Sequence, residues 1–173
     1  MVCDEYLVAR CQTGDDDAFE LLVKRWYPRM LGIAMQHTGD AEAAQDVVQE
    51  GWLGIVAGLA SLRDPARFRP WAYRIVLNKA RDWVRWRQSR RRLARETEAS
   101  ERIERAGSLT DIVGRVRAGL DELDPDHRLI LRWYYLEEMS VGEIAEVLTI
   151  PPGTVKSRLY HARQKLRDQI QEE

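Results

Sequence analysis

The sequence has few of the residues from which covalent or metal-centred sites are built. Across 173 residues it contains only two cysteines, Cys3 and Cys11, and its three histidines, His37, His127 and His161, are scattered. Two cysteines cannot form a disulfide framework, and no Cys/His cluster has zinc-ligand spacing. No HExxH motif or comparable pair suggests a catalytic acid and base. We therefore expect no metal, no cofactor, no catalytic residue and no small-molecule substrate, and we predict that the protein is not an enzyme.

Long hydrophobic runs and strand-like alternation are also absent. No apolar segment approaches the roughly 20 residues that a membrane-spanning helix needs, and the opening MVCDEYLVAR has no signal-peptide pattern. These absences predict a cytoplasmic protein with no direct membrane insertion. The periodic segments repeat at helical spacing, and 45% of the residues are apolar. The sequence therefore predicts an all-α fold of two small helical domains joined by a linker.

Charge is segregated along the chain, although the formal net charge is only −1. Residues 1–62 carry 4 basic and 10 acidic side chains, whereas residues 63–95 carry 12 and 2. Residues 96–150 are acidic again, with 6 and 13, and residues 151–173 carry 5 and 3. Two basic segments separated by acidic ones favour two nucleic-acid contacts on one chain. A solvated basic helix face is the alternative for either segment taken alone.

Residues 140–166 are typical of a helix-turn-helix. Ser140 and Glu143 form a capping-box pattern at the start of the first helix. Pro151 and Pro152 interrupt the hydrogen-bonded ladder and are tolerated in the first turn of a second helix. An ordinary helical hairpin with a solvated basic face is the alternative. In the second helix the predicted buried stripe consists of Val155, Leu159, Ala162 and Leu166. The polar and basic side chains that remain suit a DNA groove.

The N-terminal half predicts two helices before the basic segment. The first begins near Asp15–Asp17 and ends near Gly39, and the second begins at Asp40. In the second helix we expect the acidic face to point outward and the three glycines to lower stability or to permit close packing of a neighbour. The expected outward residues are Asp46, Gln49 and Glu50. The expected buried residues are Ala43, Val47 or Val48, Leu53, Val56 and Leu59.

The basic segment consists of the loop RDPARFRP and a helix in which aromatic and cationic residues alternate. Its predicted inner residues are Ile75, Val76, Ala80, Trp83 and Val84. The cations on the other side suit DNA, and flat rings such as Trp71 can stack on unpaired bases. Tryptophans at helical spacing are, however, more often core residues. Residues 92–108 read as a linker, which divides the chain into domains 1–91 and 109–173.

Three segments in order resemble a bacterial RNA polymerase sigma factor of the extracytoplasmic-function class in the sigma-70 family. DAEAAQDVVQEGWLGIV resembles the segment that binds core polymerase, and RFRPWAYRIVLNKARDWVRWRQSRR resembles the segment that reads and melts the minus-ten element. DPDHRLILRWYYLEEMSVGEIAEVLTIPPGTVKSRLYHARQKL resembles the domain that reads the minus-thirty-five element. The resemblance implies core RNA polymerase, promoter DNA and an anti-sigma factor as partners.

The resemblance also implies a role for each candidate residue. Core polymerase would be bound by Asp46, Gln49 and Glu50, whose carboxylates suit a basic partner. The melted minus-ten strand would be held by Arg63, Arg67, Arg69, Trp71, Tyr73, Arg74, Asn78, Arg81 and Arg85. The minus-thirty-five duplex would be read by Thr154, Lys156, Ser157, Arg158, Tyr160, His161 and Arg163.

Two positions depart from the family pattern. Gly54 stands where relatives commonly have a longer side chain, often Arg, and Thr149 stands where Gly often ends the first helix of the helix-turn-helix. A threonine there is strained if the backbone needs a positive φ. The rival interpretation is a stand-alone helix-turn-helix transcriptional regulator with a sensing or dimerising N-terminal half. It leaves the second basic, aromatic segment unexplained, and residues 1–90 do not alternate between strands and helices.

Overall fold

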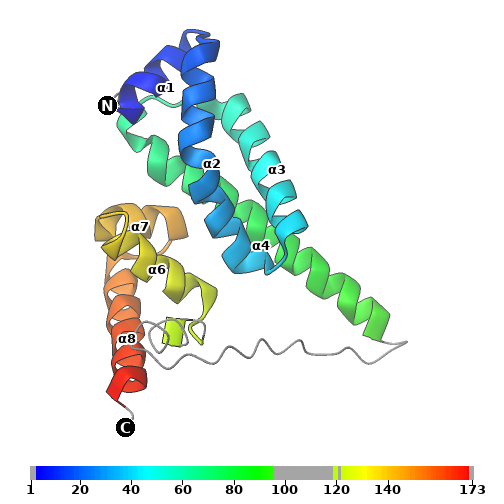
Figure 1. Ribbon diagram of the computed structural model, residues 1–173, viewed down its shortest axis with the longest axis vertical. Helices are drawn as coiled ribbons and strands as arrows, with labels where there is room; N and C mark the ends of the chain where they lie inside the picture. Colours follow the sequence, from blue (N-terminus) through cyan, green and yellow to red (C-terminus); the bar gives the residue numbers. More distant parts are fainter. Residues whose placement is uncertain (1–2, 96–118, 121, 172–173) are drawn as a thin grey trace. The chain divides into compact units, whose positions relative to one another are not determined.

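The computed structural model describes residues 3–95, 119–120 and 122–171, and these residues form helices and no strand. The predicted all-α fold is thus confirmed. The chain divides after Gln88 into two compact units (Figure 1). The helices of the first unit are α1 (Asp4–Gln12), α2 (Asp16–Thr38), α3 (Ala41–Leu59), the short 3-10 helix η1 (Pro65–Arg67) and α4 (Phe68–Arg95), whose last residues extend past this division. Those of the second are α6 (Pro125–Tyr135), α7 (Val141–Leu148) and α8 (Pro152–Gln171).

Local residues set the ends of α2 and α3. The side chains of Asp15 and Asp40 each accept a hydrogen bond from the backbone N–H three residues further on, both at 2.9 Å. These bonds satisfy N–H groups that have no partner within the helix. Gly39 ends α2 in the left-handed conformation, with φ 65°. The predicted starts near Asp15 and Asp40 and the predicted end near Gly39 are confirmed.

Helix α1 was not predicted from the sequence. It has 9 residues and buries only Leu7 and Val8, so its apolar pattern is too short to be distinctive. Tertiary contacts hold it instead. The side-chain amide of Gln12 donates to the backbone carbonyls of Leu59 at 2.9 Å and Leu62 at 2.7 Å, which ties the end of α1 to the end of α3.

Helix α4 is attached to α2 through buried aromatic rings. Trp26 of α2 is fully buried, and the rings of Phe68 and Tyr73 meet it edge-on with centroids 5.4 Å away in each case. Such edge-to-face contacts add to the gain from burying the rings. They determine which side of α4 faces the core of the first unit.

Glycines on α3 allow α4 to approach closely. A Cβ atom built at Gly51 would lie 2.9 Å from Cγ2 of Val76, and one at Gly58 would lie 2.8 Å from Cζ2 of Trp71. Both distances are shorter than a carbon–carbon contact permits. At Gly54 the nearest atom, on Ile75, would be 3.3 Å away. The close packing that the sequence allowed for is confirmed.

The second unit contains the predicted helix-turn-helix. The Ser140 side chain accepts from the backbone N–H of Glu143 at 3.1 Å, and the Glu143 carboxylate accepts from the backbone N–H of Ser140 at 2.8 Å. This reciprocal pair is the predicted capping box. Thr149 ends α7 with φ 57°, so the chain accepts the strain of a β-branched residue there. Pro152 begins α8. Val155, Leu159 and Ala162 are buried as predicted, whereas Leu166, also predicted to be buried, is only half-buried.

The predicted linker, residues 92–108, lies outside the described residues except for 92–95, which continue α4. The proposed domain bounds therefore stay a prediction. Within the described part of the chain, no helix is long and apolar enough to cross a membrane.

Candidate functional site

The outer face of α3 combines polar and apolar side chains. Asp46, Gln49 and Glu50 are exposed, as predicted. Leu53 and Val56 continue the same face toward the end of the helix, with 66% and 55% of their surface exposed. The face is thus acidic in one half and apolar in the other, which suits a partner surface that carries both cations and apolar groups.

The prediction that Leu53 and Val56 are buried is wrong. Helix α3 is apolar over most of its circumference, so periodicity alone does not say which apolar side faces the core. The face of α3 that packs against α2 and α4 contains glycine and alanine as well as larger residues. Its buried members are Ala43, Ala44, Val47, Val48, Gly51, Trp52, Ile55 and Leu59.

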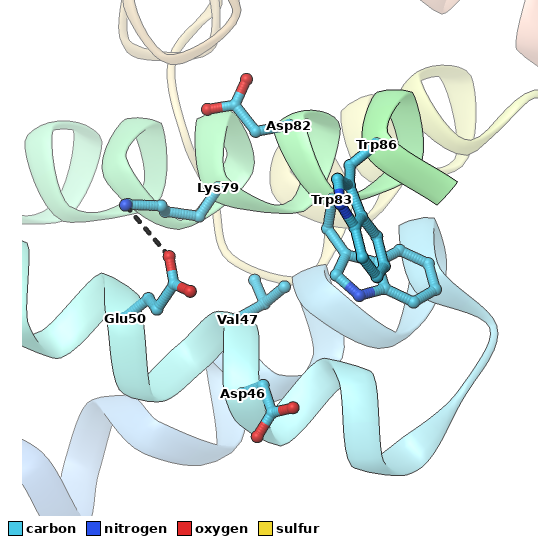
Figure 2. A pocket seen from close by; sticks show the side chains of 7 residues that line it. All are labelled: Asp46, Val47, Glu50, Lys79, Asp82, Trp83 and Trp86. Atoms are coloured by element: carbon cyan, nitrogen blue, oxygen red, sulfur yellow. Dashed lines mark hydrogen bonds and ion pairs between the residues drawn. The ribbon is translucent and has the colours of Figure 1, made fainter. Parts of the chain in front are cut away.

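The carboxylates on α3 differ in their surroundings. Oε2 of Glu50 lies 3.1 Å from Nζ of Lys79 on α4 (Figure 2). Asp46, one turn earlier, makes no ion pair with any described residue. Sequence reasoning missed Lys79 because its partner lies 29 positions away on another helix.

A stripe of polar and basic residues follows one side of α4. Five residues between positions 71 and 85 are spaced three or four residues apart, so they lie on the same face of the helix. Asn78 and Arg85 are exposed, and the others are half-buried. Arg85 pairs with Asp82 on the next turn back. The stripe consists of Trp71, Arg74, Asn78, Arg81 and Arg85. Before it, Arg63 and Arg67 are exposed and Arg69 is half-buried.

Tyr73 does not belong to this stripe. Its side chain is fully buried against Trp26, so the predicted contact of Tyr73 with DNA is inconsistent with its packing. Two residues along a helix correspond to a rotation of about 200°, which turns Tyr73 away from the side that Trp71 occupies. Trp71 is itself only half-buried, with its ring edge against Gly58.

Helix α8 exposes the predicted polar face opposite its buried stripe. Lys156, Ser157, Tyr160 and His161 are exposed, and Thr154 is half-buried. The Ser157 hydroxyl donates to the backbone carbonyl of Thr154 at 3.0 Å. These side chains have lengths and donor groups that suit base edges and phosphates in a major groove.

Two arginines on α8 are engaged within the second unit. Nη1 of Arg158 lies 3.5 Å from a carboxylate oxygen of Asp126. Arg163 donates from Nε to the Leu159 carbonyl at 3.2 Å and from Nη1 to the Tyr135 hydroxyl at 3.4 Å. Only Nη1 of Arg158 faces Asp126, so the remaining donors of the guanidinium are the ones open to a base while this pair holds.

Gln164 is an addition to the predicted α8 face. It lies one turn after Tyr160 and donates to the Tyr160 hydroxyl at 3.1 Å. Its side-chain amide has the donor and acceptor groups to contact adenine or phosphate, like the other polar side chains on this face. The spacing of four from Tyr160 is the sequence signal that could have identified it.

Comparison with known proteins decides the family. Residues 22–92 match Sigma-70 region 2, and residues 114–166 match Sigma-70, region 4. The RNA polymerase sigma-H factor of Pseudomonas aeruginosa is 34% identical over 181 residues, covering 97% of this chain and 94% of that protein. The chain belongs to the sigma-70 family. The ECF RNA polymerase sigma-E factor of Escherichia coli is 31% identical with the same coverage, which places this sigma factor in the extracytoplasmic-function class.

Solved structures resemble the sigma factor over most of its length. CnrH, solved in complex with the cytosolic domain of CnrY, is 30% identical, with a TM-score of 0.67 and 95% of both chains covered. The sigma factor RpoE from Bartonella quintana, in complex with the anti-sigma factor NepR, has a TM-score of 0.70. It is 22% identical and covers 90% of this chain and 98% of its own, so it supports the fold alone.

The family assignment resolves the rival interpretations. The N-terminal half matches a sigma-factor region, so it is not the sensing half of a stand-alone regulator. The function of the protein is that of a sigma factor in transcription initiation, and the sigma-70 family is not known for enzymatic activity.

Proposed function

We propose that this sigma factor divides promoter recognition and polymerase docking among three surfaces. The outer face of α3 docks on core RNA polymerase, the stripe on α4 holds the minus-ten strand, and the outer face of α8 reads the minus-thirty-five duplex. The factor acts in the cytoplasm, where the polymerase carries out the chemistry and the factor catalyses no reaction. Domain 1–91 would contain the first two surfaces and domain 109–173 the third, with 92–108 as the linker.

The observation that carries this proposal is the exposure of Asp46, Gln49 and Glu50 beside Leu53 and Val56. Carboxylates at the rim of an interface steer a basic partner and suppress wrong ones, whereas exposed apolar side chains supply the area to be buried. We therefore add Leu53 and Val56 to the predicted docking residues. An apolar pair of this kind on a monomer would otherwise face water.

The α4 stripe supports strand binding by its composition. Arg74, Arg81 and Arg85 supply cations that can clamp phosphates, and Asn78 supplies both donors and acceptors for a base edge. Arg63, Arg67 and Arg69 extend this basic surface toward η1. Trp71 can stack on a base only with the part of its ring that Gly58 does not cover. Tyr73 is omitted from the proposed DNA-binding set because it is a core residue.

The α8 face would enter the major groove with Ser157 and His161 at its centre and Lys156 at one side. Phosphate contacts position such a helix, and base contacts specify the sequence. Arg158 contacts DNA with the donors that do not face Asp126. We also propose an anti-sigma protein as a partner, by analogy with CnrH, which was solved in complex with the cytosolic domain of CnrY.

The test separates polymerase binding from DNA binding. Asp46→Ala with Glu50→Ala should weaken binding to core RNA polymerase by at least about tenfold while the isolated upstream duplex is bound normally. Lys156→Ala should weaken duplex binding, reduce its salt dependence by about one phosphate contact and leave core binding intact. Asp17→Ala with Glu20→Ala, which removes the same charge from exposed positions on α2, is the matched control. If both test variants lost the same activity, the division into surfaces would be wrong.

A further inference from the structure

A cleft lies between α3 and α4 beside the proposed docking face. It has a volume of about 440 Å³ and lies open to solvent. Its lining residues are Asp46, Val47, Glu50, Lys79, Asp82, Trp83 and Trp86. Lys79 and Glu50 point toward one another in Figure 2, and the two tryptophan side chains lie together away from that ion pair.

The three carboxylates of the cleft are not equally available to a partner. Asp82 pairs with Arg85 of its own helix, and Glu50 pairs with Lys79 across the cleft. Asp46 makes no ion pair with a described residue. Of the two carboxylates assigned to polymerase docking, one is therefore already neutralised within the molecule.

The pair between Lys79 and Glu50 is well suited to exchange. Its two side chains are 43% and 63% exposed, and exposed ion pairs of this kind contribute little to stability. Lys79 carries its charge on a flexible four-carbon stem, so the ammonium group can leave Glu50 without moving the helix. A cation from a basic partner then takes its place on the carboxylate, and Lys79 becomes a like charge close to that partner.

We propose that Lys79 competes with core polymerase for Glu50 and thereby sets the affinity and the salt dependence of docking. The inference rests on the proposed role of the α3 face. Lys79 holds Glu50 while the factor is free, and a cationic side chain of the polymerase displaces it on binding. Removing the charge of Lys79 therefore strengthens docking, although Lys79 touches the docking face from another helix.

The test measures binding of the full chain to core RNA polymerase at low and high salt. Lys79→Met keeps most of the side-chain stem in the cleft and removes only the charge. We expect it to tighten binding by about three- to tenfold at low salt, with a smaller gain at high salt. Lys79→Arg should bind like the wild type. Lys24→Met is the matched control, because Lys24 makes an exposed ion pair with Glu20 on α2 and does not line the cleft.

A double-mutant cycle with Glu50→Gln decides between mechanisms. If Lys79 acts by holding Glu50, Lys79→Met changes binding by less than about twofold when Glu50 is already Gln. An undiminished gain in that background, a gain equal to that of Lys24→Met, or weaker binding by Lys79→Met would each overturn the proposal. Failure of the α3 docking role itself is distinguished separately, because Asp46→Asn would then leave core binding unchanged. Thermal unfolding of each variant checks that the fold is retained.

Discussion

The α3–α4 pair of the first unit and the α7–α8 pair of the second each expose a polar face on a helix whose other side is buried. The interactions that decide which side is exposed differ between the two pairs. In α7–α8 the capping box of Ser140, the turn at Thr149 and Pro152 at the start of α8 are all local. In α3–α4 the outward face depends on contacts such as Gly51 with Val76, between residues 25 positions apart. A locally encoded surface can be predicted from the sequence, whereas a surface selected by packing against another helix is only partly predictable.

The largest effect on stability is expected when one tyrosine from each unit is replaced. Tyr73→Ala removes a fully buried ring and should lower the free energy of unfolding of the first unit by about 3 kcal/mol or more. Tyr160→Ala removes a ring that is 54% exposed and should change stability by less than about 0.5 kcal/mol, while weakening duplex binding. Chemical denaturation followed by circular dichroism measures both. A stable Tyr73→Ala variant with a selective defect in minus-ten binding would restore the original assignment of Tyr73 to DNA.

The next largest effect on stability is expected when one glycine from each unit is replaced. Gly51→Leu forces a side chain into a space where even a Cβ would lie 2.9 Å from Val76, and it should destabilise the first unit by about 2–3 kcal/mol. Gly153→Ala in α8 meets nothing within 4 Å and should be neutral or slightly stabilising. Denaturation midpoints of the two variants test the contrast. Equal tolerance of both substitutions would mean that close packing does not select the face of α3.

A smaller effect concerns the turn of the helix-turn-helix. Thr149 holds φ 57°, where a β-branched side chain is strained and glycine is not. Thr149→Gly should stabilise the second unit by roughly 0.5–1 kcal/mol, read as slower amide hydrogen exchange in α7 and α8. Thr149→Val, which keeps the β-branch, should give no such gain. Faster exchange in Thr149→Gly would show that the threonine side chain stabilises the second unit by more than its backbone strain destabilises it.

The smallest effect depends on pH. The backbone N–H of Ala18 holds the pKa of Asp15 below its ordinary value of 3.8, with Arg10 adding to the effect. The folded carboxyl thus binds its proton more weakly than the unfolded one, so its stabilising contribution is present above that ordinary value and is lost as pH falls through the folded pKa. Asp15→Asn, which keeps an accepting oxygen, should flatten the dependence of stability on pH below about pH 4. An unchanged slope would refute this role of Asp15.

The candidate sites also differ in how far they could be predicted from the sequence. The outward residues of α8 were predictable because a single buried stripe, Val155, Leu159 and Ala162, determines the opposite face. The stripe on α4 was predictable in the same way, apart from Tyr73. Leu53 and Val56 were assigned to the wrong side, because α3 has apolar residues on both sides and the sequence does not say which side α2 and α4 cover.

What the sequence by itself determined is therefore the set of local features. Helix starts at Asp15, Asp40 and Ser140 depend on side chains that bond to backbone groups within about four residues, and the charge segregation and family resemblance are properties of the chain itself. Tertiary structure alone decided that α1 forms, that Tyr73 points inward and that Glu50 pairs with Lys79. Each of these depends on which distant segments come into contact, and burial against a neighbouring helix outweighs the weak preferences of a short stretch of chain.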